Sequence, residues 1–179
     1  MNKRVVAVVI TYNPELERLK KNIASILPQV QKIIIVDNGS KNIHSIEETF
    51  NVEKVYTKQL KKNVGIAKAQ NIGFNEAKSY SADWVLTMDQ DSILASDAVQ
   101  KMLLTKVANQ DATGILAPRY IDMNWTAFQR KNEDAKIIGE IQEMDTVISS
   151  GNLVSMAAWQ SVGGFDEWLF IDQVDLDFN

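Results

Sequence analysis

The sequence contains no cysteine and a single histidine, His44. Disulfide bonds and thiolate metal sites are therefore excluded, and a histidine metal cluster cannot form. Any bound metal has to be held by oxygen ligands, which suit Mg²⁺, Mn²⁺ or Ca²⁺.

Long apolar runs are also missing, because no stretch approaches the roughly 18 to 20 apolar residues of a membrane span. Residues 1–4 and the apolar run 5–10 superficially resemble a signal peptide. The run is too short for one and ends in Thr11-Tyr12-Asn13-Pro14 without a small-residue cleavage site. We therefore expect a buried strand there, no transmembrane segment in this chain, and a cytoplasmic protein.

A basic excess is absent too. Lysine and arginine number 19 against 23 acidic residues, a net charge of −4. Nucleic acid is not an expected partner, because binding to a phosphate backbone needs a clear positive excess. With 179 residues, 45% of them hydrophobic, the chain is expected to form one domain, residues 1–179.

Apolar strand patterns alternate with helical patterns. Strands are predicted at 5–10, 32–36, 54–57, 83–88 and 114–117, and helices at 15–27, 43–49 and 65–79. A further helix is predicted after Ser96-Asp97, which can cap it, with an apolar face of Val99, Met102, Leu103 and Val107. Residues 119–145 lack periodicity and are expected to be irregular. The alternation predicts an α/β fold with a central, mostly parallel sheet flanked by helices.

Polar clusters follow three of these strands: Thr11-Tyr12-Asn13, Asp37-Asn38-Gly39-Ser40 and Asp89-Gln90-Asp91. In such sheets ligands bind at the carboxyl ends of the strands. Alternation along a strand would put Asp89 and Asp91 on one side, where two carboxylates repel unless a cation lies between them. The pair therefore indicates a divalent metal site, and the alternative is a surface turn with two solvated aspartates.

Other candidates have equally plain alternatives. Asp37 could accept a hydrogen bond from a base or ribose, or could simply form a turn. The loop Lys61-Lys62-Asn63-Val64-Gly65 could hold an anion at a helix start, or could be a solvated basic loop. Residues 149–152 could supply hydroxyl groups to a ligand, or could only form a turn. The tail 163–177 combines carboxylates with aromatics, which suits a sugar and a general base, or an acidic helix face with a buried aromatic anchor.

Taken in order, six motifs resemble the family 2 glycosyltransferases, and Asp-Gln-Asp-Ser with Leu-Phe-Ile-Asp is most similar to the rhamnosyltransferase branch. The resemblance runs from the first strand to the last residue. The six motifs are Thr11-Tyr12-Asn13-Pro14, Val36-Asp37-Asn38-Gly39-Ser40, Asn63-Val64-Gly65-Ile66-Ala67 with Asn71 and Gly73, Met88-Asp89-Gln90-Asp91-Ser92, Ser150-Gly151-Asn152-Leu153, and Gly163-Gly164-Phe165-Asp166-Glu167 through Asp175.

The resemblance implies a GT-A fold and an inverting transfer of a sugar from a dTDP- or UDP-sugar donor, with Mg²⁺ or Mn²⁺ as the cofactor. Similarity to the rhamnosyltransferase branch implies that the sugar is rhamnose. The family resemblance makes Asp91 the principal metal ligand and puts Asp89 near both ribose and metal. Asp175 would be the catalytic base, although Val174 replaces the usual glutamate, and Asp172 is the competing candidate. The residues assigned to the nucleotide sugar are Thr11, Tyr12, Asn13, Asp37, Asn38, Lys62, Asn63, Gly65, Asp89 and Gly151.

The implied acceptor is a polysaccharide or a lipid-linked glycan. Family members usually continue beyond the base motif with an arginine and further helices, so the chain resembles a C-terminally truncated catalytic core. Its full-length form would associate peripherally with the inner face of the plasma membrane. Two other functions stay open: a nucleotidyltransferase, although Thr11-Tyr12-Asn13-Pro14 is not the glycine-rich basic loop expected there, and a non-catalytic nucleotide-sugar binding module.

Overall fold

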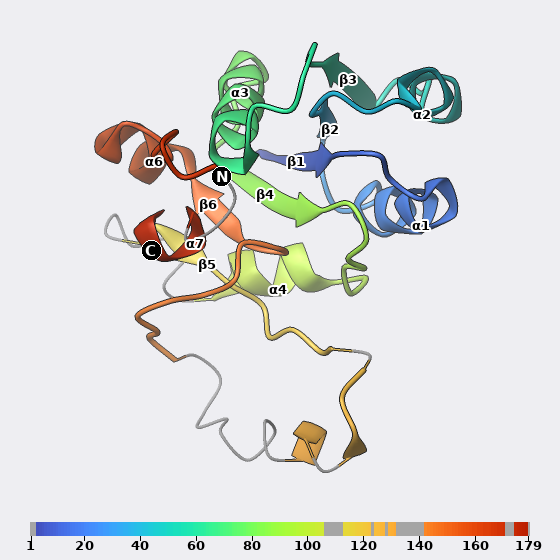
Figure 1. Cartoon of the computed structure of the whole chain (residues 1–179). Coiled ribbons are helices and arrows are strands. Elements are labelled where there is room, and N and C mark those ends of the chain that lie inside the picture. The colour runs from blue at the N-terminus through green and yellow to red at the C-terminus, as the bar shows by residue number, and fades with distance from the viewer. Residues whose placement is uncertain are drawn as a thin grey trace.

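The computed structural model describes residues 3–105, 113–122, 124–127, 129–131, 142–170 and 174–178. Helices and strands alternate through most of this part of the chain (Figure 1). Their order is β1 (Val5–Thr11), α1 (Leu16–Ile26), β2 (Lys32–Asp37), α2 (Ile43–Thr49), β3 (Val55–Gln59), α3 (Ile66–Ser79), β4 (Trp84–Asp89), α4 (Ala98–Leu104), β5 (Ile115–Leu116), β6 (Leu153–Ser155), α6 (Met156–Val162) and α7 (Val174–Phe178).

The strands form one sheet in the order β3-β2-β1-β4-β6-β5. The first four are parallel to one another, whereas β6 is antiparallel to both β4 and β5. The predicted mostly parallel sheet flanked by helices is confirmed. Sequence patterning did not predict β6, because three residues are too few to show a strand period.

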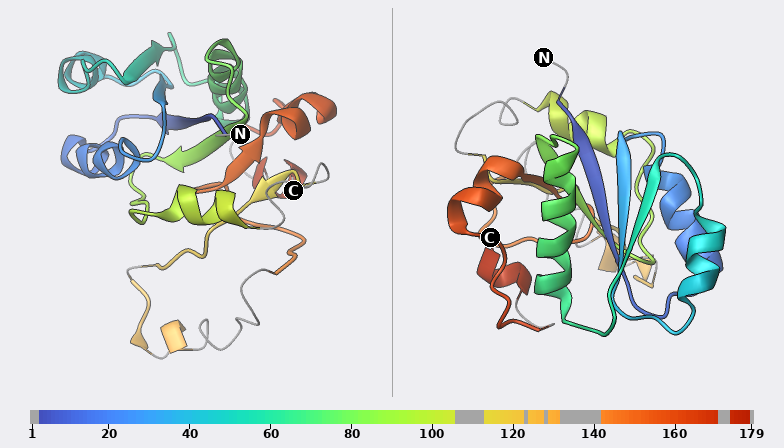
Figure 2. Two further views of the ribbon diagram at one scale, coloured as in Figure 1. Left: turned by 180° about the vertical axis from the view of Figure 1, so that it is seen from behind. Right: turned by 90° about the horizontal axis from the view of Figure 1, so that it is seen from above.

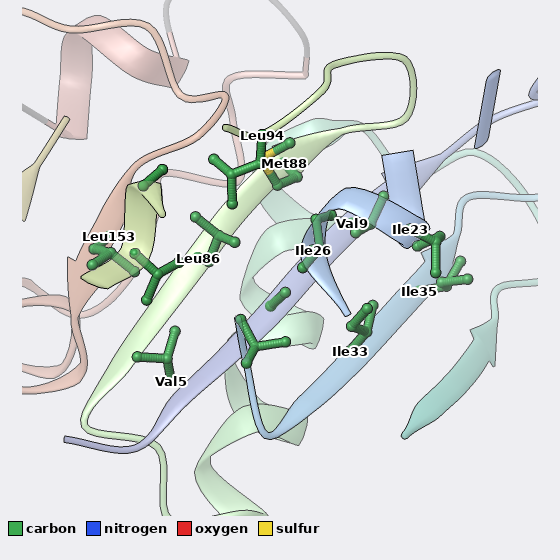
Figure 3. Packing of buried hydrophobic residues seen from close by; sticks show 14 of the residues in the cluster. Val5, Val9, Ile23, Ile26, Ile33, Ile35, Leu86, Met88, Leu94 and Leu153 are labelled. Carbon is green, nitrogen blue, oxygen red and sulfur yellow. The ribbon is translucent and has the colours of Figure 1, made fainter. Parts of the chain in front are cut away.

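Helices cover both faces of the sheet, and Figure 2 shows α3 on one side with α1 and α2 on the other. Odd-numbered residues of β1, such as Val5 and Val9, share a core cluster with residues of α1, α2 and α4. Figure 3 shows Val9 beside Ile23 and Ile26 of α1. Even-numbered residues of the same strand, Val6 and Val8, pack against α3, α6 and Phe165. Burial on both faces explains why β1 is apolar at every position instead of at alternate ones.

Helix α3 lies unusually close to the sheet. A Cβ atom on Gly73 would be only 2.3 Å from Cγ1 of Val8. Its neighbours Ala67, Ala69 and Ala77 are fully buried. These small residues allow the close packing of α3 against β1 and β2.

Two details differ from the prediction or cannot be compared with it. Asp97 precedes α4 as expected, but its side chain makes no capping hydrogen bond. Its carboxylate instead pairs with Nζ of Lys101 at 2.8 Å, one turn into the helix, and this lowers the pKa of Asp97. Val107, expected on the apolar face of this helix, lies outside the described residues.

Between β5 and β6, residues 117–122 and 142–148 contain no strand, in line with the irregular excursion expected there. The described residues 124–131 lie far from the sheet (Figure 1). Among the described helices, none is long and apolar enough to cross a membrane.

Candidate functional site

Five connections meet at one edge of the sheet. Four follow the carboxyl ends of the parallel strands β1 to β4, and the fifth, residues 149–152, precedes the antiparallel β6 and so reaches the same edge. The register places Thr11 beside Asp37 and Ile10 beside Asp89. The polar clusters singled out in the sequence are therefore neighbours in the fold, as predicted for the ends of parallel strands.

Asp37 is the fully buried centre of the β2 end, with 0% of its surface exposed. Oγ1 of Thr11 donates to its Oδ1 at 3.1 Å, and the backbone N–H of Ser40 donates to its Oδ2 at 2.9 Å. The carboxylate thus shapes the turn that follows β2, which is the alternative considered from the sequence. A contact with a base or ribose stays a prediction.

Tyr12 and Asn13 continue from Thr11 across the same edge. The backbone N–H of Tyr12 donates to Oε1 of Gln90 at 2.9 Å, while its ring is exposed. Asn13 has a positive φ of 47° and ties the β1 end to the next loop, since its N–H donates to Oγ of Ser40 at 2.7 Å. The first loop is thereby linked to both the β2 loop and the β4 loop.

Two asparagines build the loop that enters α3. Nδ2 of Asn38 donates to Oδ1 of Asn63 at 2.9 Å, and Oδ1 of Asn38 accepts from the N–H of Val64 at 2.9 Å. Oδ1 of Asn63 also accepts from the N–H of Gly65 at 2.9 Å. Lys62 is exposed beside them. The structure therefore assigns both amides a loop-shaping task and leaves the lysine at the surface.

Gly39 is where these two loops touch. Its φ is +86°, and a Cβ atom there would lie 2.7 Å from the backbone carbon of Lys62. Gly163 has the same φ of +86°, but nothing lies within 4 Å of a Cβ at that position. The two glycines therefore share a positive φ that disfavours a side chain, and Gly39 has the close contact in addition.

Gly39→Ala is expected to destabilise the chain more than Gly163→Ala. The shared left-handed conformation costs about 1 to 2 kcal/mol with a side chain. The contact with Lys62 adds about 1 to 3 kcal/mol, because backbone has to move to relieve it. Urea unfolding of both variants measures the difference, and equal free energies of unfolding would show that the two loops are not in close contact.

Asp89 and Asp91 are both exposed at the end of β4. The strand ends at Asp89, so Asp91 lies in the turn beyond it. The expectation that strand alternation orients both side chains is therefore wrong, and the turn sets the direction of Asp91. The backbone N–H of Asp89 donates to Oγ of Ser150 at 3.1 Å, and the same hydroxyl donates to Oγ of Ser92 at 2.9 Å.

Asn22 holds this turn through hydrogen bonds, a role that was not predicted from the sequence. It is fully buried on α1, where Nδ2 donates to the carbonyls of Asp89 at 2.8 Å and Ser92 at 2.6 Å. Its Oδ1 is buried without a hydrogen-bond partner in the structure. The available signal was a polar residue on the apolar face of a helix, between Leu19 and Ile23.

The donor set at this turn fits a hard divalent cation. Asp89 and Asp91 offer carboxylate oxygens, which Mg²⁺ and Mn²⁺ prefer, and the exposed position leaves room for further oxygen ligands. No group of three acidic or histidine side chains able to hold a metal occurs in the described part of the chain. Such an ion would therefore need phosphate or water oxygens besides the protein, which is how Mg²⁺ usually binds.

Residues 149–152 form a turn attached to β4. Oγ1 of Thr87 donates to the carbonyl of Ser149, and the N–H of Gly151 donates to the carbonyl of Thr87 at 2.7 Å. Gly151 has a φ of +91°, and a Cβ there would lie 3.1 Å from Pro118. Residues 149–152 thus form the turn that was the alternative to a ligand-binding role. The hydroxyl of Ser150 also hydrogen-bonds to the turn at Asp89.

The tail is described only in part. Asp172 lies outside the described residues. Asp175 lies in α7, and the structure describes its backbone but not its side chain. Trp168 is 94% exposed, so it is not a buried anchor, whereas Phe165 is only 6% exposed and packs on Phe178 of α7 with ring centroids 4.2 Å apart. The anchor of the tail is therefore Phe165, not the tryptophan next to the carboxylates.

Comparison with known proteins agrees with this geometry. The model of Glycosyl transferase family 2 matches residues 6–167. The dTDP-rhamnosyl transferase RfbF of Shigella flexneri is 34% identical over 188 residues, which cover 99% of this chain and 62% of that protein. An N-acetylglucosaminyltransferase of Bradyrhizobium elkanii is 34% identical over 115 residues, 58% of this chain and 59% of that protein. The chain thus spans about 60% of the length of these curated relatives.

Solved structures share the fold. TarS 1-349 of S. aureus in complex with UDP superposes with a TM-score of 0.70 at 18% identity, covering 98% of this chain and 53% of that one. GalNAc-T7 with UDP, GalNAc and Mn²⁺ gives a TM-score of 0.77 at 13% identity, covering 97% of this chain and 39% of that one. The fold is accordingly of the GT-A type, and the chain belongs to Glycosyl transferase family 2.

Proposed function

We propose that this chain is the core of a metal-dependent, inverting glycosyltransferase that moves rhamnose from a dTDP- or UDP-sugar donor to a polysaccharide or lipid-linked glycan. The observation that carries the donor assignment is the 34% identity, over 99% of this chain, to a dTDP-rhamnosyl transferase. The acceptor class and a location at the inner face of the plasma membrane are proposed from the motif resemblance to the family, and the cytoplasmic placement from the sequence.

The donor would lie across the carboxyl edge of the sheet. Thr11, Tyr12, Asn13 and Asp37 would hold the nucleoside; the exposed Tyr12 ring offers an apolar face for the base. On the β3 side, Asn38, Lys62, Asn63 and Gly65 would hold the diphosphate, where an exposed lysine adds positive charge. Gly151 would lie beside the sugar. These roles are supported by the shared edge and by the motif order.

Asp91 and Asp89 would hold Mg²⁺ or Mn²⁺, with Asp89 also near the ribose. When bound, such an ion supplies a Lewis acid that neutralises the charge developing on the leaving diphosphate. On the opposite side of the sugar, the carboxylate of Asp175, or of Asp172, would accept the proton of the acceptor hydroxyl. The acceptor oxygen would bond to the anomeric carbon of the sugar as the bond from that carbon to the diphosphate breaks. This in-line attack would invert the configuration at the anomeric carbon.

A thermal-shift panel tests the proposal directly. A ligand at 100 times its Kd stabilises the native state by about 2.7 kcal/mol. For a chain of this size that corresponds to a rise in Tm of about 5 to 10 °C. We expect this rise with dTDP-rhamnose and Mg²⁺ or Mn²⁺, and a much smaller one when EDTA replaces the metal.

The panel also separates the alternatives. UDP-N-acetylglucosamine is included because one relative is an N-acetylglucosaminyltransferase, and a larger rise with that donor would overturn the rhamnose assignment. An equal rise in EDTA would overturn metal dependence. Release of free dTDP from the donor shows catalysis and argues against a non-catalytic binding module, whereas binding without release supports that module.

A further inference from the structure

Helix α3 touches both the proposed donor loop and the tail that leads to α7. At its start, the backbone N–H of Ile66 donates to the carbonyl of Phe170 at 2.6 Å. Gly65, which ends the donor loop, lies against the same residue, since a Cβ on Gly65 would be 2.6 Å from that carbonyl oxygen. One helix therefore supports both halves of the proposed site.

Further along the helix, Asn71 uses its whole side-chain amide on α6 and the tail. Its Oδ1 accepts from Nε1 of Trp159 at 3.1 Å and from the backbone N–H of Phe165 at 2.9 Å. Its Nδ2 donates to the carbonyl of Phe165 at 2.9 Å and to Oε1 of Glu167 at 3.3 Å. An asparagine amide offers two donors and two acceptor lone pairs, so its hydrogen-bonding capacity is filled. The residue is only 8% exposed.

Neighbouring contacts strengthen the same attachment. Nζ of Lys68 pairs with Oε2 of Glu167 at 2.7 Å. The hydrogen bond from Lys68, with a smaller contribution from Asn71, lowers the pKa of Glu167. Gly164 passes so close that a Cβ would lie 2.8 Å from Oδ1 of Asn71. A side chain at residue 164 would therefore push the tail off the amide.

Phe165, the residue gripped through both its N–H and its carbonyl, also touches α7. Its ring lies edge-on to Phe74 of α3 with centroids 5.3 Å apart and packs against Phe178 of α7 at 4.2 Å. Val174, at the start of α7, is 3% exposed in the same core cluster. The path from Asn71 to the helix that bears Asp175 thus passes through one aromatic residue.

We infer that Asn71 is a positioning residue for the proposed transfer: it holds Phe165 and Glu167 on α3 and so sets the place of α7, and of Asp175, relative to the donor loop. The inference rests on the proposed function. The four side-chain hydrogen bonds of Asn71 go to Trp159, Phe165 and Glu167, so its effect on catalysis would be indirect. Misplacing a reacting group by about 1 Å costs on the order of 10²-fold in rate.

Asn71→Asp tests this at nearly constant side-chain volume: it keeps the oxygen that accepts from Trp159 and Phe165, loses both donated bonds, and turns a carboxylate oxygen toward the Phe165 carbonyl and Glu167. Asn71→Ala removes all four bonds. The matched control is Asn75→Ala on the next turn, since Nδ2 of Asn75 donates only to the carbonyl of Asn71 within the same helix. Transfer, or donor hydrolysis with water as acceptor, gives kcat, and calorimetry with dTDP and Mn²⁺ gives the nucleotide Kd.

We expect Asn71→Asp and Asn71→Ala to lower kcat about 10- to 100-fold while the nucleotide Kd changes less than about twofold. Asn75→Ala should match the wild type in both. A merely structural role would weaken nucleotide binding together with kcat. That result, or an unchanged kcat in folded Asn71→Asp, would overturn the inference, and Asn71→Asp decides if Asn71→Ala does not fold.

Hydrogen exchange separates this inference from the proposed function. If the wild type neither transfers nor hydrolyses any sugar, the proposed function fails on its own. Asn71→Ala removes the oxygen that accepts from both groups, so it should still speed exchange at the Phe165 amide and the Trp159 indole at least tenfold, with β1 and β2 unchanged. Unaltered exchange at both positions would show that Asn71 does not hold the tail.

Discussion

Asp175→Asn is expected to lower the rate of sugar transfer by about 10² to 10⁴, the usual contribution of a general base. Asparagine is close in size but cannot accept the proton of the acceptor hydroxyl. Nucleotide binding should be nearly unchanged, because the proposed base contacts the acceptor and not the nucleotide. Steady-state transfer kinetics with calorimetry on the same preparation measure both quantities.

Asp177→Asn is the control for this change, because Asp177 is an exposed carboxylate on the same short helix, α7. It removes an equal charge and should leave the rate within about twofold of the wild type. Asp172→Asn discriminates the two proposed bases: the variant with the larger loss of kcat identifies the base. Full activity in both would exclude Asp172 and Asp175 as the base.

Asp91→Asn is expected to abolish most of the metal-dependent part of nucleotide binding. Even hydrogen-bond partners of metal ligands are worth about 10- to 100-fold in metal affinity, so losing a charged ligand should cost at least as much. Titration of dTDP in the presence of Mn²⁺ and again in EDTA isolates the metal-dependent part. In EDTA the variant and the wild type should bind alike.

Asp97→Asn provides the matched control, because it removes the same charge from the same connection between β4 and α4. Asp97 is paired with Lys101 and is proposed to take no part in metal binding. Its metal-dependent binding should equal that of the wild type. If Asp91→Asn retains the full Mn²⁺ effect, the assignment of Asp91 as principal metal ligand is wrong.

Much of the fold follows from local patterns in the sequence. Val5 to Ile10 is apolar at every position, which is typical of a strand covered on both faces. The helix predicted at 65–79 is present, and Gly73 and its alanine neighbours let it lie close to the sheet. The parallel strands then determine which loops meet, because their carboxyl ends share an edge. The candidate site was therefore predictable as a set of loops.

What could not be predicted depends on contacts distant in sequence. β6 is a strand only because Leu153 to Ser155 pair with β4 and β5. Asn22 matters only because α1 packs beneath the β4 turn, 67 residues away from Asp89. The direction of Asp91 depends on where β4 ends, and strand boundaries are poorly determined by propensity. Each feature that was not predicted depends on tertiary contacts, which override or add to the local preference of the sequence.

The attachment of residues 149–152 to β4 has a consequence for how this scaffold can vary. The chain leaves the sheet after β5 and returns at residues 149–152, which hydrogen bonds to Thr87 attach to β4. The connection from β5 to residue 149 is therefore held at both of its ends. Doubling the length of such a span costs only about 0.6 kcal/mol in closure entropy. Insertions or deletions there can change the length of this connection while the carboxylate turn keeps its place.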